Sequence, residues 1–119
     1  MKEKENYKIY NQRSGSTLIH YAYYARSIYS RLLGLMFTKD LPEGHALILE
    51  PCQSIHTCFM RYPIDVLFLD DDNKVIRHIS HMRPWRMTTF YFRASKVIES
   101  KSGMSPLDCQ VGDQLQIRS

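Results

Sequence analysis

Asp65 is the residue whose setting most suggests chemistry. It lies near the start of residues 64–69, a run that is otherwise apolar. A carboxylate placed there loses water and must pair with a cation, accept hydrogen bonds or hold a proton. One interpretation is a group that faces a ligand or transfers a proton. The other is a structural carboxylate bound to the backbone amides of a neighbouring loop, to Arg61 or to Arg31.

A second group of residues could line a pocket for a small molecule. Such pockets are mostly apolar, with a few polar groups that fix the orientation of the ligand. Trp85 lies between Arg83 and Arg86, so it could stack on a planar or anionic ligand. The apolar members could equally be core residues, with methionine filling gaps in the packing. The candidate pocket consists of Met36, His56, Met60, Arg61, Pro63, Asp65 and Trp85.

Three cysteine and histidine residues have a spacing that zinc ligands could use. Cys52, His56 and Cys58 follow the pattern Cys-x3-His-x-Cys, and Cys109 or His81 could complete a tetrahedral site. The paired Cys-x2-Cys pattern of strong zinc motifs is missing, so we expect no metal and no cofactor. A Cys58 nucleophile would need a histidine as base, and nothing in the sequence selects such a pair.

The elements that must hold these residues are mainly short strands. Alternating or continuously apolar runs predict strands at 17–23, 46–49, 55–60, 64–69, 75–81, 94–99 and 114–117. Apolar residues recur at helical spacing over 25–33 and Gly34 follows, which predicts one short amphipathic helix. We therefore expect an α+β chain of mostly antiparallel strands. Its fold would be a small closed or half-closed β-barrel with the helix packed against it.

The polar and charged residues 1–16 predict a mobile N-terminal tail, and residues 17–119 predict a single domain. The formal net charge is +4, but the basic residues are scattered and no nucleic-acid motif is present, so we expect no nucleic-acid partner. No apolar run is long enough to span a membrane, and we expect no secretory signal because the charged N-terminus is followed by no apolar stretch. These features favour the cytoplasm and leave the oligomeric state open.

Several motifs in order resemble a family of uncharacterised bacterial and archaeal proteins, domain of unknown function 192 (DUF192). They include Gly34-Leu-Met36, the stretch His56-Thr-Cys-Phe-Met-Arg-Tyr-Pro-Ile-Asp65, Arg83-Pro-Trp-Arg86 and Gly112-Asp-Gln-Leu115. The resemblance covers about residues 17–117 and implies a compact β-rich barrel with a short helix, but no reaction. The family usually has Leu-Glu-Leu-Pro-Ala-Gly after the tryptophan loop. Here Glu99 and Gly103 are kept, while the apolar and proline positions between them are not.

Two hypotheses of function follow. The first is a non-catalytic module that binds a small-molecule ligand or a protein partner in the apolar pocket. The alternative is a small enzyme that uses Asp65 or a Cys/His pair. The sequence contains no visible set of nucleophile, base and orienting group, and this favours the first hypothesis.

Overall fold

The computed structural model describes residues 6–25, 43–58, 60–103 and 107–119. The expected helix over 25–33 lies outside these ranges, apart from Ala25, which ends a strand. No helix within the described ranges is long and apolar enough to cross a membrane. The strands are β1 (Tyr7–Asn11), β2 (Ser16–Ala25), β3 (His45–Leu49), β4 (Ile64–Leu69), β5 (Val75–Met82), β6 (Lys96–Lys101) and β7 (Leu115–Arg118).

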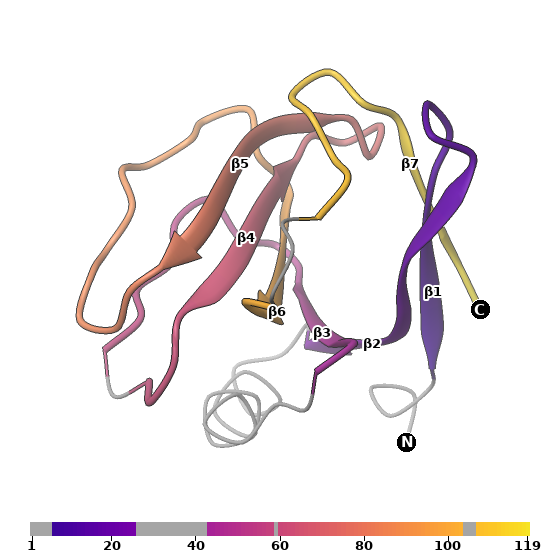
Figure 1. Ribbon diagram of the computed structural model, residues 1–119. Coiled ribbons are helices and arrows are strands. Elements are labelled where there is room, and N and C mark those ends of the chain that lie inside the picture. Colours follow the sequence, from indigo (N-terminus) through magenta and orange to yellow (C-terminus); the bar gives the residue numbers. More distant parts are fainter. Residues whose placement is uncertain (1–5, 26–42, 59, 104–106) are drawn as a thin grey trace.

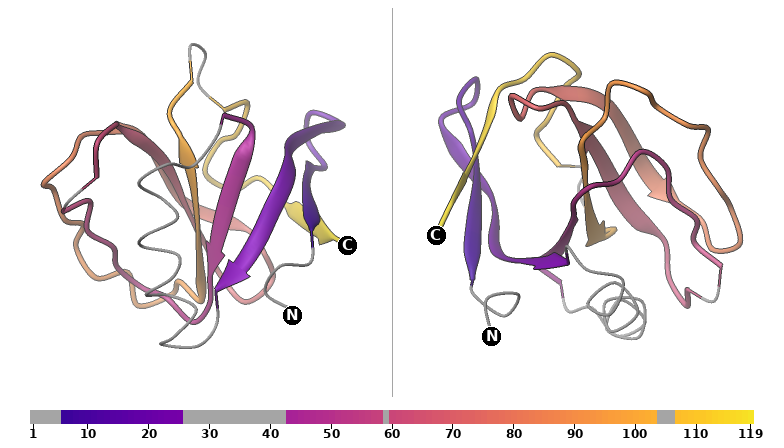
Figure 2. Two further views of the ribbon diagram at one scale, coloured as in Figure 1. Left: turned by 90° about the horizontal axis from the view of Figure 1, so that it is seen from below. Right: turned by 180° about the vertical axis from the view of Figure 1, so that it is seen from behind.

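The strands form one sheet in the order β5-β4-β6-β3-β2-β1-β7. Neighbours are antiparallel except β2 and β3, which run parallel. The sheet curls into a half-barrel, as Figures 1 and 2 show from three directions. Its edge strands β5 and β7 come together at one end, where Lys74 pairs with Gln114. The expected mostly antiparallel, half-closed barrel is therefore confirmed.

Each face of the sheet carries its own apolar cluster. Along β6, Ile98 faces one cluster and Val97 the other, because neighbouring side chains of a strand point to opposite faces. The inner cluster, within the curve of the sheet, consists of Ile9, Ile19, Ala22, Ala46, Ile48, Leu67, Leu69, Val75, Ile98, Cys109 and Leu115. The outer cluster consists of Ile55, Met60, Ile64, Val66, Phe68, Met82, Ala94 and Val97.

Strand β1 lies within residues 1–16, for which the sequence predicts a mobile tail. Ile9 is fully buried in the inner cluster, and β1 pairs with both β2 and β7. The surrounding charges hide this short strand in the sequence, because only Tyr7 and Ile9 alternate with polar neighbours. The half-barrel thus begins earlier in the chain than the expected domain boundary.

The described residues 55–58 and 60 do not form the expected strand. Thr57 and Met60 close a turn through a backbone hydrogen bond of 3.2 Å, which breaks the extended run. The backbone before the turn and at Thr57 instead bonds to the loop between β5 and β6. Ile55 is one example, since its carbonyl accepts a hydrogen bond of 2.9 Å from Thr88 N–H. The other expected strands appear as β2 to β7, with small shifts of their ends.

A buried polar network joins the β1–β2 hairpin to the loop before β7. The carboxyl of Asp113 accepts hydrogen bonds from Asn11 Nδ2 (3.0 Å), Arg13 Nε (2.8 Å) and Gln110 N–H (2.8 Å). Asn11 also donates to the backbone carbonyl of Asp108 at 2.9 Å. Burial raises the pKa of the Asp113 carboxyl, but these hydrogen bonds lower it more, so its pKa lies below the ordinary value. The network fixes the loop that closes one end of the half-barrel.

Candidate functional site

Glu99 lies in the middle of β6, the strand with β3 and β4 on its two sides. Its register partners are Leu47 on β3 and Val66 on β4. It shares a strand face with Val97, so its side chain projects on the side of the outer cluster. The sheet therefore places one carboxyl group against an apolar surface.

This carboxyl group is desolvated, and no described residue is its partner. Glu99 is only 7% exposed, and burial raises its pKa to about 7. No group in the described ranges gives it a hydrogen bond or an ion pair. Lys101 is the cation nearest to it along the same strand face, and Lys101 Nζ lies 4.8 Å from the centre of the Tyr62 ring. A buried carboxyl that is left unpaired is costly and is a feature of functional sites.

Glu99 is a retained family position, but it is not among the site residues predicted from the sequence. A signal was available, because Glu99 follows the apolar pair Val97-Ile98 in an expected strand. A strand that is covered on both faces forces any charged residue within it to be buried. Burial of β6 on both faces was the missing information, since all of Lys96 to Ser100 are buried.

Asp65, the residue that the sequence favoured, is buried but serves the backbone. Ile79 pairs with Val66 and Met82 pairs with Ile64, so two residues of β5 lie opposite Asp65 in a β-bulge. Asp65 Oδ1 accepts a hydrogen bond of 2.9 Å from the N–H of His81, which has a φ of 54°. This is the structural role that the sequence left open, with a backbone amide as donor. Asp65 also lies on the opposite face of β4 from the outer cluster.

Replacing Asp65 with asparagine should cost much less stability than replacing it with alanine. Asparagine keeps an oxygen that can accept the His81 N–H, whereas alanine leaves this amide unpaired. An unsatisfied buried donor costs about 1–3 kcal/mol. Urea unfolding of both variants checks the difference, and equal losses would show that the bulge does not depend on this hydrogen bond.

Two exposed candidates, His56 and Trp85, come from adjoining loops. His56 forms a β-bridge with Met87, so residues 52–60 and 83–92 run side by side. Thr57, which is fully buried, is the main link: its carbonyl accepts a hydrogen bond of 3.0 Å from Trp85 N–H, and its own N–H donates to Arg86 at 2.8 Å. No pattern in the sequence indicates this role of Thr57. The two joined loops cover the outer cluster and present His56 and Trp85 to solvent.

The described members among the remaining candidates are Met60, Arg61 and Pro63. Met60 is buried in the outer cluster, and Arg61 is exposed. Pro63 is partly buried, and its carbonyl accepts a hydrogen bond of 3.1 Å from Ser102 N–H. Met36 lies outside the described residues. Met60 is thus the described candidate that shares the outer cluster, while Asp65 is separated from it by the sheet.

The cysteine and histidine residues form no chemical centre in the described part of the chain. No group of three or more His, Cys, Asp or Glu side chains in these ranges could hold a metal ion. His56 Nδ1 accepts the backbone N–H of Cys58 at 3.3 Å, which is a local turn contact. Burial raises the pKa of the Cys109 thiol to about 12, so this thiol is a poor nucleophile at neutral pH.

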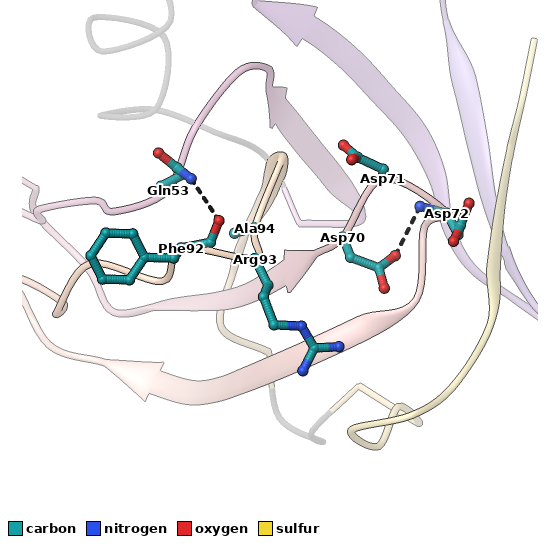
Figure 3. A pocket seen from close by; sticks show the side chains of 7 residues that line it. All are labelled: Gln53, Asp70, Asp71, Asp72, Phe92, Arg93 and Ala94. Carbon is teal, nitrogen blue, oxygen red and sulfur yellow. Dashed lines mark hydrogen bonds between the residues drawn. The ribbon is translucent and has the colours of Figure 1, made fainter.

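A shallow depression lies where the loop before β6 meets the turn between β4 and β5 (Figure 3). Asp70 uses its Oδ1 to accept the N–H groups of Asp72 and Lys74, at 2.9 and 3.0 Å, which shapes that turn. Gln53 Nε2 donates to the carbonyl of Phe92 at 2.9 Å. These contacts hold the loops in place. They account for the aspartate run as a turn, as its sequence suggests.

Comparisons with known proteins give the same family as the motifs. The profile of DUF192, described as "Uncharacterized ACR", matches residues 9–117. A UPF0127 protein of Pyrococcus furiosus is 32% identical over 99 residues, covering 78% of this chain and 83% of the relative. A UPF0127 protein of Pyrococcus horikoshii is 34% identical over 98 residues, covering 77% and 83%. Both relatives are archaeal.

The fold is also found among solved structures. The crystal structure of a protein of unknown function from Novosphingobium aromaticivorans superposes with a TM-score of 0.68. The two sequences are 18% identical, and the match covers 93% of this chain and 83% of the other. At this identity the similarity shows a shared fold.

Proposed function

The chain belongs to the uncharacterised DUF192 family, and we propose that it is a non-catalytic module that binds a small ligand against the outer face of its sheet. Glu99 is the polar anchor of the proposed site, and the apolar side chains beside it are the rest of the surface. Met60 belongs to the outer cluster on this face and stays in the proposed lining. The cytoplasmic location that the sequence favours is part of the same proposal.

One observation carries this proposal: Glu99 is buried, and within the described ranges it is unpartnered. Asp113 differs from Glu99 in this respect, because its buried carboxyl accepts hydrogen bonds from three residues. Buried carboxyl groups usually have hydrogen-bond partners, and because no described residue bonds Glu99, the partner that we propose for it is a ligand. Small-ligand sites combine an apolar lining with a few such groups.

The chemistry of the site defines the class of ligand. An ionised carboxyl only accepts hydrogen bonds, so the matching group is a donor, and a cationic donor gives the stronger bond. The neighbouring Leu47, Val66 and Val97 are apolar, so the remainder of the ligand should be apolar too. We therefore propose a small amine, or another cationic donor, attached to an alkyl or aryl body.

Binding is favoured over catalysis because the reactive groups are engaged elsewhere or isolated. Asp65 is bonded to the His81 amide, and the Cys109 thiol is held protonated by burial. Among the described residues, none joins Glu99 as nucleophile or orienting group through a hydrogen bond. A catalytic set of nucleophile, base and orienter needs such contacts.

Titration of the ¹⁵N-labelled protein with hexylamine tests the proposal, with hexanol as the matched neutral probe. At about pH 8, where Glu99 is mostly ionised, hexylamine should shift the backbone amides of residues 97–101 saturably and more strongly than hexanol. The Glu99→Gln variant should lose the preference for the amine and keep any response to hexanol. Equal responses to both probes, or an unchanged preference in the variant, would exclude Glu99 as the anchor.

A further inference from the structure

The loop between β5 and β6 exposes four large apolar side chains within a short stretch, and we call them the aromatic platform: Trp85, Met87, Phe90 and Phe92. Met87 is 76% exposed and Phe92 is 83% exposed. The Phe90 and Phe92 rings lie 5.0 Å apart, so these two side chains share one surface, and Trp85 and Met87 are exposed on the same loop. The loop runs along the outer edge of the molecule, on the side of β5 away from β7 (Figure 1). An exposed apolar cluster of this kind marks a surface that contacts another protein or a membrane.

The loop is held firmly in the shape that exposes these side chains. Thr88 bonds to Ile55 through both its N–H (2.9 Å) and its Oγ1 (3.0 Å). Tyr91 turns inward, with its ring 4.5 Å from that of Phe68. Trp85 has a φ of 62°, a left-handed conformation that is rare for such a residue and is fixed here by its bond to Thr57. The exposure is therefore built into the fold.

The charges on the loop that carries the aromatic platform have one sign. Arg83, Arg86 and Arg93 are all exposed, and they flank or separate the apolar side chains. The chain carries no aspartate or glutamate between residues 73 and 98. The acidic turn at 70–72 lies beside Arg93, at the C-terminal end of the platform (Figure 3). Arg83 and Arg86 should therefore bind an anionic surface more strongly than Arg93 does.

We propose that the aromatic platform docks the protein onto an anionic lipid bilayer. Large apolar side chains surrounded by cations suit the boundary between acyl chains and negatively charged headgroups. Tryptophan and arginine both favour this boundary, and methionine and phenylalanine can enter the acyl region without a shaped partner. The docking is independent of the ligand site at Glu99, so either proposal can fail alone.

The protein contains one tryptophan, and it lies on the platform, so its fluorescence reports docking directly. Vesicles of equimolar phosphatidylglycerol and phosphatidylcholine should shift Trp85 emission to the blue, and vesicles of pure phosphatidylcholine should not. The double variant Met87→Ser, Phe92→Ser should weaken partitioning by at least about tenfold, because two buried apolar side chains are lost. Arg83→Gln with Arg86→Gln should weaken it by roughly tenfold or more at low salt.

Val111→Ser is the matched control, because Val111 is 63% exposed but lies on the loop before β7. It should leave partitioning unchanged, and thermal unfolding should confirm that every variant is folded. Three outcomes would overturn the proposal: no emission shift with anionic vesicles, equal partitioning of the platform variants and the wild type, or a shift caused by an oligothymidylate and not by vesicles. The last outcome would assign the surface to single-stranded nucleic acid.

Discussion

Replacing Asp113 with alanine is expected to lower the free energy of unfolding by about 3 kcal/mol, the largest effect that we expect from a single truncation. Asp113 is only 6% exposed. Its carboxyl accepts hydrogen bonds from Asn11, Arg13 and Gln110. Alanine leaves the buried Asn11 amide without one of its acceptors and frees the loop before β7. Urea unfolding at neutral pH measures the loss.

Asp108→Ala is the matched control for this prediction. Asp108 bonds to the same arginine, at 2.9 Å from Arg13 Nη2, but its side chain is 64% exposed. Exposed ion pairs contribute little, so this variant should lose less than about 1 kcal/mol. Similar losses for Asp108→Ala and Asp113→Ala would mean that burial of the Asp113 network does not determine its contribution.

Replacing Glu99 with glutamine should make the protein less sensitive to pH. Burial raises the pKa of Glu99 from its ordinary 4.5 to about 7, so the folded state binds this proton more tightly than the unfolded chain does. Stability is therefore highest below the ordinary pKa and falls as the pH rises through the folded pKa. The full loss corresponds to about 3 kcal/mol, at 1.36 kcal/mol for each pH unit.

The comparison between the variant and the wild type isolates this single group. Between about pH 5 and pH 8, the wild type should lose roughly 2–3 kcal/mol more stability than Glu99→Gln. All five histidines are present in both proteins and cancel in the difference. Glu43→Gln, a change at an exposed glutamate, should follow the wild type. A wild type and a Glu99→Gln variant that share one pH profile would show that Glu99 is not desolvated.

The strands that could be predicted from sequence are those whose pattern reflects a single environment. Residues 64–69 are apolar throughout, and β4 is buried along its whole length between β5 and β6. Residues 75–81 follow an acidic turn, and β5 pairs back onto β4 as expected. Strand β1 could not be predicted, because its partners β2 and β7 determine its burial and β7 lies at the other end of the chain.

The site was harder to predict than the fold, because two acidic residues occupy similar apolar strands. Asp65 and Glu99 both look buried in the sequence, and only the donors across the sheet distinguish them. The β5 bulge supplies an amide to Asp65, whereas no described residue supplies a donor to Glu99. Bulges and cross-strand donors depend on register, which a single sequence does not encode locally.

The exposure of the loop residues was also difficult to predict from the sequence. Trp85 and His56 were grouped with buried residues as pocket lining, yet they lie at the surface of joined loops. Thr57 determines this arrangement through its backbone and hydroxyl bonds to residues 83–86. Threonine is common in strands and loops alike, so its identity alone could not indicate that role.

Glu99 is the proposed anchor for a cationic ligand, and its carboxyl is desolvated. A ¹³C NMR titration of its side-chain carboxyl, with and without saturating hexylamine, tests this most directly. We expect a midpoint near pH 7 in the free protein and a clearly lower midpoint with the amine, because a nearby cation favours the charged carboxylate. A midpoint near the ordinary 4.5 of glutamate, unchanged by the amine, would contradict both the burial of the charge and the proposed site.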